Sequence, residues 1–188
     1  MKTRVLILIG ILIIAFAATI APVTAADTGT AIITGNPPAK MDITMHGGIT
    51  DWDLDPDPAA QPLTDSTNVT MDVRTNTKSW DIRVMDALDD GKTSAGFMEE
   101  WDGAAYGTQT LTNALIVAAT TNAYYTADPD VTLTGVNQRI GVSDGAAHAA
   151  GNHLGLPLTF KQTVDIADPV LAGTDVYRIV VTFTGTTL

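Results

Sequence analysis

The sequence predicts an all-β protein, a single antiparallel β-sandwich of the Greek-key or jelly-roll type. Short segments of alternating apolar and polar residues recur along the chain, which is the pattern of strands that bury one face. Clusters of glycine, proline, asparagine and aspartate separate these segments and predict turns. Apolar residues almost never recur at helical spacing. Many short strands with frequent turns are typical of antiparallel sandwiches.

Residues 1–25 predict a Sec-type signal peptide. Met1-Lys2-Thr3-Arg4 supplies positive charge, residues 5–21 are apolar, and small residues lead to an expected cut after Ala25. An uncleaved membrane anchor is the alternative, because the apolar run approaches the ~20 residues that span a bilayer. Cleavage leaves residues 26–188 as one β-sandwich domain, secreted and associated with the cell surface, and long enough to form its own core.

Residues 68–88 contain the most regular alternation and predict a β-hairpin closed by a loop at 76–79. In the expected register two apolar pairs share the buried face and two opposite-charge pairs share the outer face. Each pair would add a few tenths to ~1 kcal/mol, and a slip of one residue would lose all four. The expected pairs are Val73 with Ile82, Met71 with Val84, Asp72 with Arg83, and Arg74 with Asp81.

The remaining strand candidates are short and lie on both sides of this stretch. Residues 55–62 contain three prolines and predict a surface loop. Residues 93–114 and 141–153 are irregular, with several glycines, and also predict loops. The other strand candidates are residues 31–35, 41–45, 49–54, 115–119, 131–135, 156–166 and 177–183.

The three tryptophans differ in their surroundings. Trp80 falls on the same side of its strand as Ile82, and Trp52 on the same side as Leu54, so both are predicted to be core residues. Trp101 lies between two acidic residues in a predicted loop. Because aromatic faces bind sugars through apolar contact, Trp101 is the candidate for contact with a carbohydrate ligand.

Four alternate aspartates, Asp51, Asp53, Asp55 and Asp57, are the candidate calcium ligands, because calcium needs several oxygen atoms converging on one ion. An EF-hand is excluded, since its required glycine and glutamate positions hold Pro56 and Pro62. A calcium loop of another kind is one interpretation. The alternative is that the aspartates form the solvent face of a strand and the loop after it.

No arrangement of residues predicts an enzyme. Glu99, Glu100 and Asp102 suggest a glycosidase pair at most, and adjacent acids are common on an acidic surface. No serine lies in a GxSxG pattern, and His46, His148 and His153 lack a recognised metal spacing. Asn68 opens an Asn-Val-Thr sequon, a possible glycosylation site on an exported protein.

Charge and cysteine content exclude several other classes. The formal net charge is −11, which argues against nucleic acid and, once the signal is removed, against an anionic membrane as partners. The chain has no cysteine, so it has no disulfide framework, thiolate nucleophile, cysteine zinc site or lipid-modified cysteine.

Several motifs together resemble those of secreted β-sandwich surface proteins of archaea and bacteria. The motifs are Trp52-x-Leu54, residues 71–76, Trp80, Gln162-x-Val164, Asp168, Leu171-x-Gly173, Tyr177 and Val181-x-Phe183-Thr184. This group includes WxL-like wall-associated domains and, more distantly, matrix-fibre subunits of the TasA type. The resemblance covers most of residues 31–188 and implies a surface or extracellular-matrix role without catalytic residues. Where a WxL domain carries a second, distal Trp-x-Leu, this chain has Val-Thr-Phe-Thr-Gly.

The sequence therefore predicts a non-enzymatic structural or adhesive surface protein. Its N-terminal strand, Ala26 to Gly35, would add to an open sheet edge of another copy and link subunits. Other surface proteins or glycans are further candidate partners. The alternative function is an extracellular calcium- or carbohydrate-binding module that uses residues 51–57 or Trp101.

Overall fold

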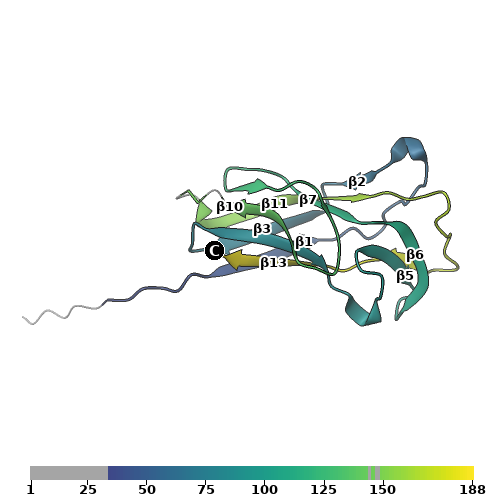
Figure 1. Ribbon diagram of the computed structural model, residues 1–188, viewed down its shortest axis with the longest axis horizontal. Helices are drawn as coiled ribbons and strands as arrows, with labels where there is room; N and C mark the ends of the chain where they lie inside the picture. Colours follow the sequence, from purple (N-terminus) through teal and green to yellow (C-terminus); the bar gives the residue numbers. More distant parts are fainter. Residues whose placement is uncertain (1–33, 144, 147–148) are drawn as a thin grey trace, which may run out of the picture. The chain divides into compact units, whose positions relative to one another are not determined.

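The computed structural model describes residues 34–143, 145–146 and 149–188 (Figure 1). Residues 38–188 form one compact unit. The predicted signal peptide, residues 1–25, and most of strand candidate 31–35 lie outside the described residues. The described chain is almost entirely β, which confirms the predicted fold class. No helix in these residues is long and apolar enough to cross a bilayer.

The strands form three antiparallel sheets. The largest has the order β1–β3–β11–β7–β9, with β2 also paired to β11; the second has the order β13–β4–β10–β8, and the third β12–β5–β6. Among the described residues, η1 (Pro58–Ala60) and η2 (Asp89–Gly91) are three-residue 3-10 turns between strands. The strands are β1 (Met41–Gly47), β2 (Leu63–Asp65), β3 (Val69–Thr75), β4 (Trp80–Asp86), β5 (Phe97–Trp101), β6 (Tyr106–Ala114), β7 (Ile116–Ala119), β8 (Tyr125–Ala127), β9 (Val131–Thr132), β10 (Gln138–Ser143), β11 (Gly151–Gln162), β12 (Val176–Arg178) and β13 (Val181–Thr187).

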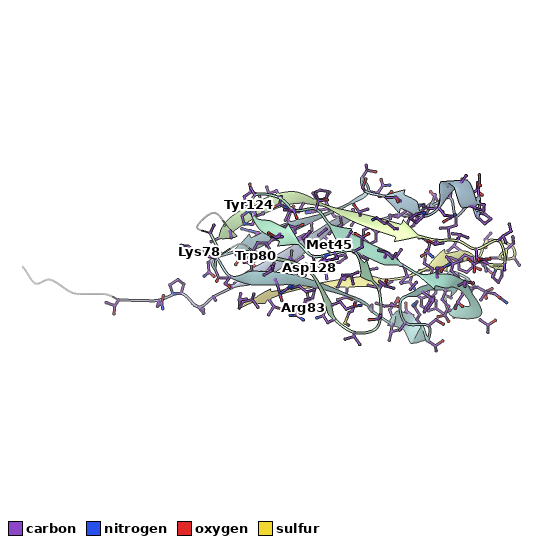
Figure 2. The ribbon with its side chains drawn as sticks, turned by 45° about the horizontal axis from the view of Figure 1, so that its top comes forward. Met45, Lys78, Trp80, Arg83, Tyr124 and Asp128 are labelled. Atoms are coloured by element: carbon purple, nitrogen blue, oxygen red, sulfur yellow. The ribbon has the colours of Figure 1, made fainter. Side chains whose placement is uncertain are left out.

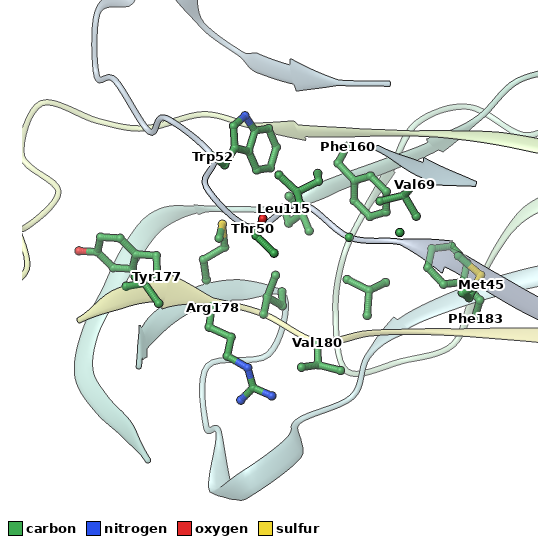
Figure 3. Close-up of a pocket in the computed structure, with 17 residues that line it drawn as sticks. Met45, Thr50, Trp52, Val69, Leu115, Phe160, Tyr177, Arg178, Val180 and Phe183 are labelled. Carbon is green, nitrogen blue, oxygen red and sulfur yellow. The ribbon is translucent and has the colours of Figure 1, made fainter. Parts of the chain in front are cut away.

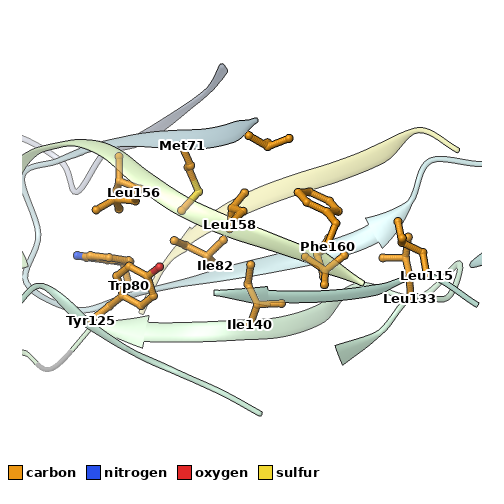
Figure 4. Packing of buried hydrophobic residues seen from close by; sticks show 14 residues of the cluster. Met71, Trp80, Ile82, Leu115, Tyr125, Leu133, Ile140, Leu156, Leu158 and Phe160 are labelled. Carbon is orange, nitrogen blue, oxygen red and sulfur yellow. The ribbon is translucent and has the colours of Figure 1, made fainter. Parts of the chain in front are cut away.

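The main core lies between the two larger sheets (Figure 4). Alternate side chains of β3 and β4 point into it, and Trp80 is completely buried, as its parity predicts. The Trp80 indole N–H donates to the carbonyl oxygen of Ala149 at 2.9 Å, so its polar atom is satisfied. Full burial of each large apolar side chain contributes about 1.5–3 kcal/mol. The buried members of this cluster are Val69, Met71, Val73, Trp80, Ile82, Val84, Leu115, Val117, Tyr125, Leu133, Ile140, Leu156, Leu158 and Phe160.

For residues 68–88 the predicted pairing of the two strands with each other is wrong, whereas the predicted buried face of each strand is correct. Strand β3 pairs with β1 and β11, and β4 pairs with β13 and β10, so neither strand has an edge left for the other. The connection at residues 76–79, where Figure 2 labels Lys78, crosses from one sheet to the other. The apolar side chains of both strands therefore face each other across the core.

The charged side chains of these strands find other partners. Asp72 accepts hydrogen bonds from the Gly155 backbone N–H at 2.8 Å and pairs with His46 at 2.9 Å. Arg83 binds Asp81 of its own strand at 2.8 Å, and the Arg74 Nε donates to Asn152 at 3.2 Å. Opposite charges spaced by two along one strand can thus pair within that strand.

The structure confirms some of the other strand candidates and differs from several other expectations. Candidate 41–45 is confirmed as part of β1, whereas 49–54 alternates in burial without joining a sheet. Residues 93–114 are not a loop, because β5 and β6 form most of the third sheet. Register shifts interrupt the β5–β6 ladder, which explains why no clean alternation marks it in the sequence. The predicted loop 141–153 is shorter than expected, since β10 ends at Ser143 and β11 begins at Gly151.

Candidate interaction site

One side of the sandwich is bounded by two edge strands, β1 of the largest sheet and β13 of the second. Within the described residues, β1 pairs only with β3 and β13 only with β4. Side chains of β1 lie on the backbone of β13 at Gly185. A Cβ atom there would come within 2.7 Å of Met41 Cε and 2.9 Å of Ile43 Cδ1. The absence of a side chain at Gly185 thus lets the two edges approach closely. We call this line of contact the seam.

Beyond Met45 the seam opens into a pocket of about 560 Å³ (Figure 3). One wall consists of Met45, residues 47–50 and Trp52, and the other of residues 176–181 and Phe183, while Val69, Leu115 and Phe160 reach it from the core. Most of the lining is apolar, and Arg178 is its one charged side chain. The volume lies in the range of sites that bind small molecules or large apolar side chains.

The local sequence explains why the seam widens here. Strand β1 ends at Gly47, whose φ of +80° places it in the left-handed region. A Cβ atom at this position would lie 1.9 Å from the Asn68 carbonyl oxygen, so only glycine fits the turn. The half-buried Ile49 and Trp52 then pack against the core without extending the sheet. On the other wall, β13 begins only at Val181. The two edge strands therefore flank the pocket only at one end, through Met45 and Gly47 of β1 and Val181 and Phe183 of β13.

Trp101, the predicted ligand contact, is engaged within the protein. The Arg178 guanidinium lies over its ring at 4.1 Å from the centroid, a cation–π contact, and Tyr106 meets the ring edge-on at 4.9 Å. Arg178 also donates to Asp89 at 2.8 Å and to the Tyr106 hydroxyl at 3.1 Å. Burial, and the hydrogen bond that Tyr106 donates to Asp89, raise the pKa of Tyr106 well above its usual value. The side chain of Arg178 thus occupies the neighbourhood in which a sugar would stack on Trp101.

The four aspartates of the candidate calcium site remain exposed and do not converge. Asp55 accepts the backbone N–H of Asp57 at 2.9 Å, and Asp57 accepts that of Ala59, which caps η1. Asp51 and Asp53 alternate with the half-buried Trp52 and Leu54. In the described part of the chain, no group of three or more aspartate, glutamate and histidine side chains could hold a metal ion.

Asn68, the candidate glycosylation site, is exposed in the turn before β3. Its side-chain amide donates to Asp65 at 2.5 Å, and its backbone N–H donates to the same carboxylate at 3.0 Å. Partial burial alone would raise the pKa of Asp65, but hydrogen bonds from Asn68 and Thr67 lower it overall. The sequon is thus accessible, with its amide nitrogen engaged by a neighbouring carboxylate.

The other acids and histidines considered from the sequence, where the structure describes them, are held by local contacts. Glu99 is buried and accepts the backbone N–H of Ser94 at 3.1 Å, while Glu100 accepts that of Thr108 at 3.1 Å. His153 is buried, stacks on Tyr124 at 4.0 Å and bonds the Ala149 carbonyl through Nε2. His148 lies outside the described residues. These acids therefore serve backbone groups of their own chain.

Sequence reasoning did not identify the seam. Its side chains, such as Ile49, Val181 and Phe183, are inward-facing residues of the same kind as the rest of the core. Alternation indicates which side chains point inward, but it does not indicate whether an opposing strand covers them. Gly47-Gly48, which ends β1, is the only signal of this region in the sequence.

Comparison with protein-family models, with curated proteins and with solved structures finds nothing that matches this chain.

Proposed function

We propose that this protein is a non-enzymatic, secreted or cell-surface structural protein that associates with itself. In this proposal the seam between β1 and β13 accepts residues 26–35 of a second copy. The observation that carries it is the apolar pocket at the end of the seam, flanked by two edge strands. The N-terminal pattern of residues 1–25 supports export, and the acidic, cysteine-free composition is compatible with an extracellular protein.

Strand addition requires unpaired main-chain groups and a place for alternate side chains. Both edge strands offer main-chain groups, since each pairs on one side only within the described residues. The incoming segment contains Ala31-Ile32-Ile33-Thr34-Gly35, whose isoleucines are apolar and β-branched. Every second side chain of an added strand points inward, so one of the two isoleucines would enter the pocket.

The negative charge of the chain opposes such an assembly. Cleavage after Ala25 removes Lys2 and Arg4, so copies of residues 26–188 have a formal net charge of −13 and repel one another at low salt. Main-chain hydrogen bonds and apolar contact would have to overcome this repulsion. Association should therefore strengthen as salt is added, because salt screens the repulsion and favours apolar burial.

Sedimentation velocity on residues 26–188 across a wide concentration range tests the proposal. We expect concentration-dependent growth that is lost when residues 26–35 are deleted. A synthetic peptide of residues 26–35 should bind the deleted protein and raise its melting temperature. A control peptide with Ile32→Asp and Ile33→Asp should not. The proposal fails if the protein stays monomeric at all concentrations and the peptide leaves the melting temperature unchanged.

The acceptor side can be tested separately. Val181→Asp places a charge in the wall of the pocket, and we expect it to abolish peptide binding. Thr182→Asp, at the neighbouring position of β13, places the same charge on the opposite face of the strand and should leave binding intact. Equal loss in both variants would show that the seam is not the acceptor.

A further inference from the structure

A lysine and an aspartate are completely buried together where the chain leaves β4. Both side chains are 0% exposed, and Lys92 Nζ contacts Asp86 Oδ2 directly. Asp86 is the last residue of β4, and Lys92 follows η2. Neither residue lines the pocket of the seam. The proposed function does not use this pair.

The surrounding backbone holds the pair in one arrangement. Asp86 Oδ1 accepts the N–H of Leu88 at 3.1 Å, and Oδ2 accepts that of Gly96 at 2.7 Å. Leu88 has a φ of 50°, a left-handed conformation that is costly for leucine and that accompanies the turn back onto the carboxylate. Gly96 cannot be replaced without a clash, because a Cβ atom there would lie 2.0 Å from the Leu133 carbonyl oxygen. The nitrogen and the carboxyl group are thus preorganised.

An amide would keep the hydrogen bonds of Leu88 and Ser94, and only the Gly96 N–H, which donates to Oδ2, would lose its acceptor. A lysine ammonium has three N–H donors, and in the described chain Nζ has two acceptors, Asp86 Oδ2 and the Ser94 carbonyl oxygen at 2.6 Å. An amide would have one N–H, for which Ser94 is the acceptor, and one carbonyl oxygen, for which Leu88 is a donor. It would also remove two charges from a site without water contact, where charges are costly to bury.

We propose that Lys92 Nζ and Asp86 Cγ become joined by an amide bond that forms within the folded protein. Transfer of one proton from the ammonium to Oδ2 leaves a neutral amine beside a neutral carboxylic acid. Nζ then attacks Cγ, and the Leu88 N–H holds the developing charge on Oδ1. The C–Oδ2 bond breaks, Oδ2 takes a second proton from the nitrogen, and one water molecule leaves. No oxidant, reductant or cofactor is required.

The mass of the unaltered full chain, measured after denaturation, tests this proposal directly. We expect it to be lower than the mass of its sequence by one water molecule. Trypsin should then fail to cut after Lys92, so that the peptide 84–92 is missing. In its place we expect 84–139, lighter by one water and without backbone fragments between Asp86 and Lys92. An unaltered mass together with recovery of peptide 84–92 would overturn the proposal.

A variant separates this bond from another reaction that loses water. Asp86 could instead close on the following main-chain nitrogen to form a cyclic imide, which needs no lysine. Lys92→Arg keeps the charge but lacks the amine nucleophile, and its mass should equal that of its sequence. The amide assignment is wrong if the mass of Lys92→Arg is also lower by one water molecule. It is equally wrong if fragmentation of peptide 84–139 shows backbone breaks between residues 86 and 92. The fragmentation result stands even if the variant folds poorly.

Discussion

Truncation of Trp80 to alanine should be among the most destabilising single changes in this protein. The side chain is completely buried and contacts the rings of Tyr125 and His153, with centroids 5.8 Å and 6.2 Å away. Its removal leaves a cavity, and tryptophan-to-alanine changes in cores cost about 3–5 kcal/mol. The lost hydrogen bond adds little, because the Ala149 carbonyl oxygen still accepts from His153 at 2.9 Å. At about 2–4 °C per kcal/mol for a chain of this size, we expect the melting temperature to fall by roughly 6–20 °C.

Urea unfolding followed by far-ultraviolet circular dichroism measures this cost without depending on tryptophan fluorescence. The matched control is Trp101→Ala, whose half-buried ring loses mainly its contacts with Arg178 and Tyr106. The cation–π contact is worth about 0.5–1 kcal/mol, so the control should cost clearly less than Trp80→Ala. If the two variants lose equal stability, the assignment of Trp80 to the core and of Trp101 to a half-buried position is refuted.

Two further predictions concern charges on the sheets. Hydrogen bonds from the Gly155 N–H and from His46 lower the pKa of Asp72 in the folded state. Its contribution to stability is therefore present above the unfolded pKa of about 3.9 and is lost as pH falls through the lower folded value. The advantage of the unaltered protein over Asp72→Asn in urea midpoint should shrink from pH 7 to pH 3, and a constant advantage would contradict this. A double-mutant cycle between Asp72 and Arg83 should show no measurable coupling, because the strands lie in different sheets. The cycle between Asp81 and Arg83 should show about 0.5–3 kcal/mol, because the Asp81 carboxylate is buried, and coupling in the first cycle instead would restore the hairpin.

Local patterns in the sequence determined the class of the fold and the direction of most side chains. Period-two alternation identified the inner faces of β3 and β4 correctly, down to Met71, Val73, Ile82 and Val84. The buried Trp80 also followed from parity, whereas the sequence left residues 51–57 open between calcium ligands and a solvent-facing segment. These features can be predicted from short stretches of sequence because the orientation of a strand side chain depends only on its own position in the pleat.

Only the tertiary structure decided which strands are neighbours. The 76–79 connection is short enough for a hairpin, and four favourable pairs supported one, yet β3 and β4 each find two other partners. Local patterns likewise did not indicate the seam, the contacts of Trp101 with Arg178, or the buried pair of Asp86 and Lys92. Each depends on contacts between segments, or on a backbone turn, and neither produces a periodic pattern in the sequence. All strand edges of the chain compete for partners, and the outcome depends on main-chain N–H and C=O groups that nearly every residue carries, proline lacking only the N–H.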